Sequence, residues 1–263
     1  MSPVPDERVV ARLRAAGCVF AEEEAALLGE AAVDAEHLDR LVDQRASGTP
    51  LEQILGWAEF CGLRVVVAPT VFVPRRRTEL LVRLALEVVR PGDTVVDLGC
   101  GSGAIAAALL AARPDLEVHA TDVDPAAVAC ARRNLPPERV HQGDLYDALP
   151  AGLRGRLAIV VANAPYVPTD AIATMPPEAR DHEARVALDG GPDGLDVQRR
   201  LIAQAPDWLS PGGVLVVETS GSQAGGTTAE MAAAGLVAEI REEPMTGATA
   251  AVGRAPGTTP AVV

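Results

Sequence analysis

Lysine is absent from this chain of 263 residues, so all 23 of its basic residues are arginine, against 36 acidic residues. The resulting net charge of -13 argues against broad nucleic-acid binding, which needs a basic surface. Aromatic residues make up only 3%, so the core must be aliphatic. No apolar stretch approaches the ~20 residues of a membrane span, and residues 1–8 lack the pattern of a secretory signal. We therefore expect a cytoplasmic protein with no membrane partner.

Cysteine is also scarce, and its four positions are scattered along the chain. Cys18, Cys61, Cys100 and Cys130 form no Cys-x-x-Cys pair, and no histidine stands beside them at the spacing of a metal ligand. In a cytoplasmic protein this pattern predicts reduced thiols. We expect no metal site.

The chain divides into three segments that differ in their pattern of apolar and polar residues. Residues 6–45 carry apolar side chains at helical spacing among acidic ones, and Ser47–Pro50 interrupts that pattern. Two short apolar runs around Cys61-Gly62 then predict a β-hairpin. We expect a helical unit that recognises a macromolecular substrate, a linker with the hairpin, and a main domain, at residues 1–48, 49–77 and 78–263.

Strand and helix patterns alternate through the main domain. We expect strands at 94–98, 118–121, 140–141, 157–162 and 214–218, and helices at 78–89, 102–112, 125–134 and 197–209. Such alternation builds right-handed βαβ units. It predicts an α/β, Rossmann-like fold, with helices on both faces of a mostly parallel twisted sheet. Residues 167–194 show no periodicity, and we expect this long loop to close over a functional site.

A glycine-rich loop, Asp97–Gly103, follows the first of these strands and opens a helix. Glycines allow the sharp turn and the close approach of a ligand, and the helix start offers free N–H groups. Asp122 comes 19 residues after Gly103, where an acid suits the two hydroxyls of a ribose. The pattern predicts a site for an adenosine cofactor, made by Asp97, Gly99, Cys100, Gly101, Ser102, Gly103 and Asp122.

The identity of the cofactor is less directly encoded. Read from Gly99, the loop is Gly-x-Gly-x-x-Ala, which a nicotinamide dehydrogenase also shows. The third glycine, Gly103, and the position of the loop behind a helical unit favour S-adenosylmethionine. After the third strand, Asp144 could accept a hydrogen bond from an adenine amino group, with Leu145 and Tyr146 walling the base.

The fourth strand is followed by Asn163-Ala164-Pro165-Tyr166. Here the chain resembles the HemK-type protein-(glutamine-N5) methyltransferases, which modify a glutamine of peptide-release factors and carry Asn-Pro-Pro-Tyr at this point. Residues 50–63, 73–79 and 187–195 are similar to that family's hairpin, Pro-Arg-x-x-Thr-Glu and Ala-Leu-Asp-Gly-Gly blocks. The resemblance implies a class I methyltransferase fold, S-adenosylmethionine as cofactor, and a protein substrate with an exposed glutamine, with a release factor as the candidate.

The resemblance also implies roles for these four residues. An amide nitrogen is a poor nucleophile, so it must be held facing the methyl group. The Asn163 side chain can accept a hydrogen bond from the substrate amide and donate one to its carbonyl, while the Ala164 carbonyl accepts the second N–H. Tyr166 would pack on the flat amide. The expected catalytic residues are thus Asn163, Ala164, Pro165 and Tyr166. The same four residues and Arg75 are expected to bind the substrate, and Asn163 is also expected to contact the cofactor.

Three departures from the family pattern leave alternatives open. Ala164 replaces a proline and loses its fixed φ. Arg76-Arg77 stand where the family usually has Pro-Glu, so the run Arg75–Arg77 is either functional or a solvated basic patch. The end of the chain is weakly matched.

The other functions considered are a methyltransferase acting on another planar nitrogen, of a nucleobase or a small molecule, a nicotinamide-dependent oxidoreductase, and a non-catalytic binding module. The net charge disfavours a nucleic-acid substrate. Without lysine, the Tyr-x-x-x-Lys of many oxidoreductases is impossible.

Overall fold

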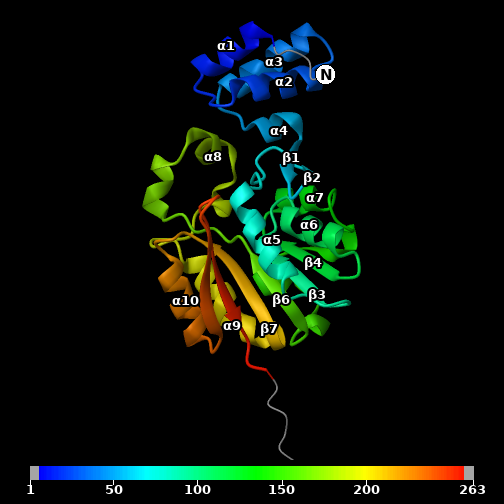
Figure 1. The fold of residues 1–263 in the computed structure, drawn as a ribbon, viewed down its shortest axis with the longest axis vertical. Coiled ribbons are helices and arrows are strands. Elements are labelled where there is room, and N and C mark those ends of the chain that lie inside the picture. Colours follow the sequence, from blue (N-terminus) through cyan, green and yellow to red (C-terminus); the bar gives the residue numbers. More distant parts are fainter. Residues whose placement is uncertain (1–5, 258–263) are drawn as a thin grey trace, which may run out of the picture.

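A helical unit forms one end of the molecule in the computed structural model, which describes residues 6–257 (Figure 1). Its three helices are α1 (Glu7–Ala15), α2 (Ala21–Ala31) and α3 (Ala35–Ala46). Side-chain oxygens of Asp6 and Asp34 accept backbone N–H groups at the starts of α1 and α3, which satisfies donors that a helix leaves free. A small aliphatic core that includes Leu13, Leu28 and Val42 holds the helices together.

A short helix, α4 (Leu51–Leu55), and the hairpin β1 (Trp57–Phe60) and β2 (Leu63–Val66) connect this unit to the main domain. The two hairpin residues between the strands, Cys61 and Gly62, both have positive φ, as the tightest hairpin turns require. The predicted hairpin is confirmed. Helix α4 was not predicted, because five residues are too few to show a helical period.

A seven-stranded sheet forms the main domain, in the order β5-β4-β3-β6-β7-β9-β8. The first five strands in that order are parallel, and β9 runs antiparallel to both its neighbours. The prediction of a mostly parallel, Rossmann-like sheet is confirmed, whereas the last two strands and the helix α10 (Ala224–Ala233) were not predicted. The strands are β3 (Thr94–Leu98), β4 (Glu117–Asp122), β5 (Val140–Gln142), β6 (Leu157–Ala162), β7 (Leu209–Thr219), β8 (Val237–Glu243) and β9 (Ala248–Arg254).

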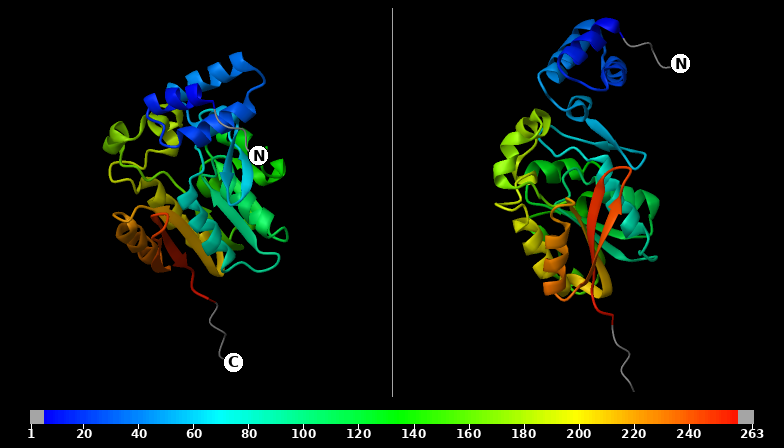
Figure 2. Two further views of the ribbon diagram at one scale, coloured as in Figure 1. Left: turned by 45° about the horizontal axis from the view of Figure 1, so that its top comes forward. Right: turned by 60° about the vertical axis from the view of Figure 1, so that its left-hand side comes forward.

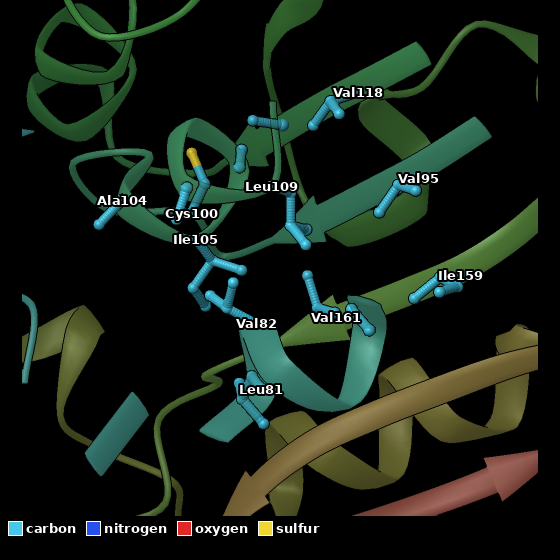
Figure 3. Packing of buried hydrophobic residues seen from close by; sticks show 14 of the residues in the cluster. Leu81, Val82, Val95, Cys100, Ala104, Ile105, Leu109, Val118, Ile159 and Val161 are labelled. Carbon is cyan, nitrogen blue, oxygen red and sulfur yellow. The ribbon is translucent and has the colours of Figure 1, made fainter. Parts of the chain in front are cut away.

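Helices cover both faces of the sheet, with α5, α6 and α7 on one side and α9 and α10 on the other (Figure 2). Neighbouring residues of a strand point to opposite faces, so Val95 belongs to one apolar layer and Val96 to the other. In the first layer, Val82, Ile105 and Val161 come together from two helices and a strand (Figure 3). The helices are α5 (Glu79–Leu86), α6 (Ala104–Ala112), α7 (Pro125–Ala131), α9 (Asp196–Trp208) and α10 (Ala224–Ala233).

The segment 167–194, expected to be an irregular loop, contains a six-residue helix, α8 (Pro177–His182), between two 3-10 turns. The expectation was wrong in this respect because such short helices leave no period in the sequence. The segment reaches the helical unit, where Glu178 forms an ion pair with Arg45 at 2.5 Å. Arg45 is buried and is also hydrogen-bonded to Glu24, so one side chain joins the two regions.

The strand order fixes where a ligand can bind. The chain leaves β3 and β6 at the same edge of the sheet, and the two strands are neighbours from which the order runs in opposite directions. In open α/β sheets this switch point is the usual place for a ligand crevice. The Asp97–Gly103 loop and the segment after Ala162 therefore meet there.

Candidate active site

The glycine loop has the left-handed backbone that its composition predicts. Gly99, Gly101 and Gly103 have φ of 69°, 56° and 78°. The N–H groups of Gly99 and Cys100 both donate to the Thr121 carbonyl at 2.9 Å, which ties the loop to β4. A Cβ on Gly103 would lie 2.9 Å from a methyl of Leu135, so the third glycine serves the packing of α6.

Asp122 stands at the end of β4 beside this loop. One carboxylate oxygen accepts the Gly101 N–H at 2.8 Å, and the other accepts the Asp124 N–H at 2.9 Å. Burial raises the pKa of Asp122 above its ordinary value. The carboxylate lies on the wall of a cavity of about 250 Å³. The predicted cofactor residues that also line it are Gly99, Gly101, Asp144, Leu145 and Asn163.

The remaining predicted cofactor residues lie behind the cavity wall. Asp97 is buried and accepts the Ala106 N–H at 3.2 Å, while its second oxygen has no hydrogen-bond partner among the described residues. Burial raises the pKa of Asp97 to about 7. Cys100, Ser102 and Gly103 are likewise absent from the wall, so the structure gives these four residues a place in holding the loop rather than in lining the cavity.

The end of the cavity near β5 differs from the prediction. Asp144 lies on the wall but forms an ion pair with Arg200, which was not predicted. The expectation that Tyr146 walls a base was wrong, because its ring is fully buried and stacks on Trp208. Further wall residues that sequence reasoning missed are Phe72, Val123, Val186 and Val197.

A second, smaller cavity of about 70 Å³ adjoins the first. Asn163, Ala164, Pro165 and Tyr166 all line it, and so does Arg75, so the structure brings the five residues of the expected substrate site together. The side-chain amide of Asn163 donates to the Thr78 hydroxyl at 3.2 Å, which fixes its orientation. Because Asn163 and Pro165 belong to both walls, the two cavities meet at this motif.

Two buried carboxylates hold the arginine run. Arg75 pairs with Glu183 at 2.6 Å, and Glu183 also accepts the Val73 N–H at 3.0 Å. Arg77 pairs with Glu218 at 3.0 Å. Of the three arginines, only Arg76 has a side chain without a hydrogen bond or ion pair to the rest of residues 6–257, so the solvated-patch alternative holds for Arg76 alone. Neither carboxylate was predicted, since nothing in the sequence links positions more than a hundred residues apart.

The larger cavity fits an S-adenosyl group. A carboxylate stands at the strand end where a ribose would lie, two glycines keep the wall free of side chains, and Phe72 and Leu145 supply apolar surface. Neither these walls nor any other place within residues 6–257 gathers three side chains that could hold a metal ion. No helix in the same part of the chain is long and apolar enough to cross a membrane.

Known proteins match both the sequence and the fold. The methyltransferase small domain family matches residues 63–191. A release factor glutamine methyltransferase of Geobacter sulfurreducens is 43% identical over 188 residues, which cover 70% of this chain and 65% of that protein. One from Deinococcus radiodurans is 41% identical over 204 residues, covering 77% and 73%. A solved methyltransferase from Pyrococcus furiosus shares the fold, with a TM-score of 0.56 and 18% identity over 74% of this chain and 90% of its own.

Fold, glycine loop and strand-end acid together define an S-adenosylmethionine-dependent methyltransferase with the class I fold. Within that class, the chain belongs to the release factor glutamine methyltransferase family. The predicted family resemblance and the predicted cofactor are confirmed, and the alternative of a nicotinamide-dependent oxidoreductase is wrong. The match spans just under two thirds of the length of the Geobacter relative, at 65%.

Proposed function

We propose that the chain methylates the side-chain amide nitrogen, N5, of a glutamine in a peptide-release factor. One observation carries the proposal: Asn163 lies where the cofactor cavity meets a pocket large enough for an amide and little more. The relatives' names agree with this substrate. The small pocket and the acidic chain also count against a nucleobase, the alternative planar nitrogen.

The residues have distinct tasks in this proposal. Gly99, Gly101 and Asp122 hold the cofactor, which when bound supplies an electrophilic methyl group. Asn163, held by Thr78, orients the acceptor amide through its side chain. The Ala164 carbonyl accepts the second amide N–H, so the nitrogen faces the larger cavity. This geometry favours the positive charge that develops on nitrogen, and after transfer the nitrogen gives up one proton to solvent water.

We further propose that the helical unit recognises the folded substrate. A cleft of about 470 Å³ separates the unit from α8, and its walls include Phe20, Leu27 and Met175. Arg75 and Arg77 line both this cleft and the small pocket, so a substrate loop lying in the cleft would reach Asn163. Phe20 is 66% exposed, so its ring is available to pack against a substrate that enters the cleft.

The role of the helical unit is testable at Phe20. Phe20→Ser should raise KM for an intact release factor about tenfold, because an aromatic anchor at an interface is worth roughly 1–2 kcal/mol. KM for a short glutamine peptide, which cannot span the cleft, should stay the same. Val33→Ser, at another exposed apolar residue outside the cleft, is the matched control. Equal effects on protein and peptide would contradict this division of labour.

The reaction itself is tested with purified protein, labelled S-adenosylmethionine and a release factor. Label should appear on one glutamine, located by mass spectrometry of the digested factor. A factor with asparagine at that position should take up none, because the shorter side chain cannot reach Asn163. If the label appeared instead on nucleic acid or on a small molecule from cell extract, that molecule would be the methyl acceptor and glutamine would not.

A further inference from the structure

Arg77 belongs to a closed triangle of polar contacts at the acceptor pocket. Its Nε donates to Glu218 at 3.0 Å, and its Nη2 donates to the Tyr166 hydroxyl at 2.7 Å. The Tyr166 hydroxyl in turn donates to the same Glu218 oxygen at 3.1 Å. Three segments far apart in the chain therefore meet here: the turn before α5, the motif after β6, and the end of β7.

The burial of Glu218 makes this triangle energetically important. Its side chain is only 3% exposed, and a buried carboxylate is costly unless a cation and hydrogen bonds compensate it. Its second oxygen has no partner within residues 6–257, and in that same range Arg77 is the one cationic side chain within salt-bridge distance. Arg77, at 46% exposure, reaches it from the pocket mouth. Removing the arginine would leave the charge uncompensated beside Tyr166.

We infer that Arg77 is a positioning residue, which neutralises Glu218 and thereby fixes Tyr166 against the acceptor amide. The inference rests on the proposed function, in which Tyr166 packs on that amide. It concerns this chain in particular, because the family pattern usually has glutamate at position 77, and a glutamate there would repel Glu218. Since Arg77 also lines the cleft, it stands where the substrate segment enters the pocket.

The kinetic test compares five variants with the wild type. Arg77→Gln should lower kcat about 10-fold through misplacement of Tyr166, with KM and cofactor affinity within twofold. Arg77→Lys keeps the charge and should recover most of the loss. Tyr166→Phe removes the hydroxyl that Arg77 holds, so the double variant should be no worse than Arg77→Gln alone. Arg76→Gln, which changes a neighbouring arginine whose side chain has no partner among residues 6–257, should match the wild type. The inference would be overturned if the kcat losses of the two single variants multiplied in the double variant, or if Arg76→Gln and Arg77→Gln lowered kcat equally.

A second measurement needs no substrate. The chain contains two tyrosines, Tyr146 and Tyr166, so ring-labelled tyrosine gives two NMR signals. Arg77→Gln and Arg77→Lys should both shift the Tyr166 signal and leave that of Tyr146, which is buried elsewhere, in place. Arg76→Gln should shift neither. An unmoved Tyr166 signal would disprove the contact whatever the enzyme methylates. If the Tyr166 signal shifted but the protein methylated no glutamine, the contacts among Arg77, Tyr166 and Glu218 would stand and the proposed function would be refuted.

Discussion

The two halves of the active site are built in different ways. The cofactor half is mostly backbone: positive φ at three glycines, two N–H groups on the Thr121 carbonyl, and one carboxylate that holds the loop. The acceptor half is mostly side chain. Its walls depend on ion pairs between residues 108 and 141 positions apart, Arg75 with Glu183 and Arg77 with Glu218.

The backbone of the cofactor half is the part that suits the whole class, whereas the ion pairs of the acceptor half are particular to this chain. A backbone cradle suits a cofactor that is the same in every methyltransferase of the class, and its geometry tolerates changes in neighbouring side chains. Ion pairs with buried carboxylates are specific and costly to break by removing one partner. We therefore expect substitutions in the cofactor half to change binding, and those in the acceptor half to change turnover.

The largest expected effect is on cofactor binding. Asp122→Ala should weaken S-adenosylmethionine binding by roughly 2–4 kcal/mol, because it removes charge-assisted hydrogen bonds to the ribose. It also releases the Gly101 N–H that shapes the loop. Calorimetry measures the loss. Asp144→Ala is the matched comparison, and it should cost much less, since Asp144 is half exposed and already paired with Arg200. If Asp122→Ala bound S-adenosylmethionine with unchanged affinity, Asp122 would not be a cofactor-binding residue.

The second-largest expected effect is on turnover, at Asn163. Asn163→Ala should lower turnover by ~10²-fold or more with cofactor affinity little changed, since the lost interaction matters most in the transition state. Asn163→Asp keeps an acceptor but loses the donor and adds a charge, so it should be similarly impaired. Steady-state rates on a release factor and calorimetry with the cofactor separate the two quantities. Near-native turnover in both variants would refute orientation of the amide by Asn163.

The same difference explains how much could be predicted from the sequence. The glycine loop, the acid at the next strand end and the Asn163–Tyr166 motif are short patterns that can be read along the chain, and they predicted the fold class and the cofactor. The strands at 94–98 and 157–162 were predicted with their observed bounds because they are short, mostly apolar and almost entirely buried.

The rest depended on contacts that no local pattern encodes. Glu183 and Glu218 look like ordinary acids in the sequence, and only the fold brings them to the arginine run. Asp144 was expected to remain free for adenine, but α9 places Arg200 beside it. Strand β8 was missed because it forms the sheet edge, where charged residues such as Arg241 and Glu242 hide the strand pattern.

The smallest expected effect concerns Ala164, where the chain departs from the family's proline. Pro165 already favours extended backbone at position 164, which a proline there can adopt. Among residues 6–257, no turn or side-chain hydrogen bond uses the Ala164 N–H, so none is lost. Ala164→Pro should therefore change turnover by less than about threefold, and the stiffer unfolded chain should stabilise the fold by about 0.4–1 kcal/mol, read from denaturant unfolding. The Ala164 carbonyl, which we propose accepts the substrate N–H, is kept.

A nearby position provides the control for that substitution. Ala162 pairs with strands on both sides, so Ala162→Pro should destabilise the fold clearly, through a lost ladder bond in the middle of the sheet. Ala164 is itself only 2% exposed, so crowding by the proline ring would appear as a loss of stability without a change in rate. If Ala164→Pro instead abolished turnover while the protein stayed folded, the motif would need a backbone that proline cannot adopt. The acceptor half would then hold its substrate differently from the Asn-Pro-Pro-Tyr enzymes, and the contrast with the shared cofactor half would be sharper still.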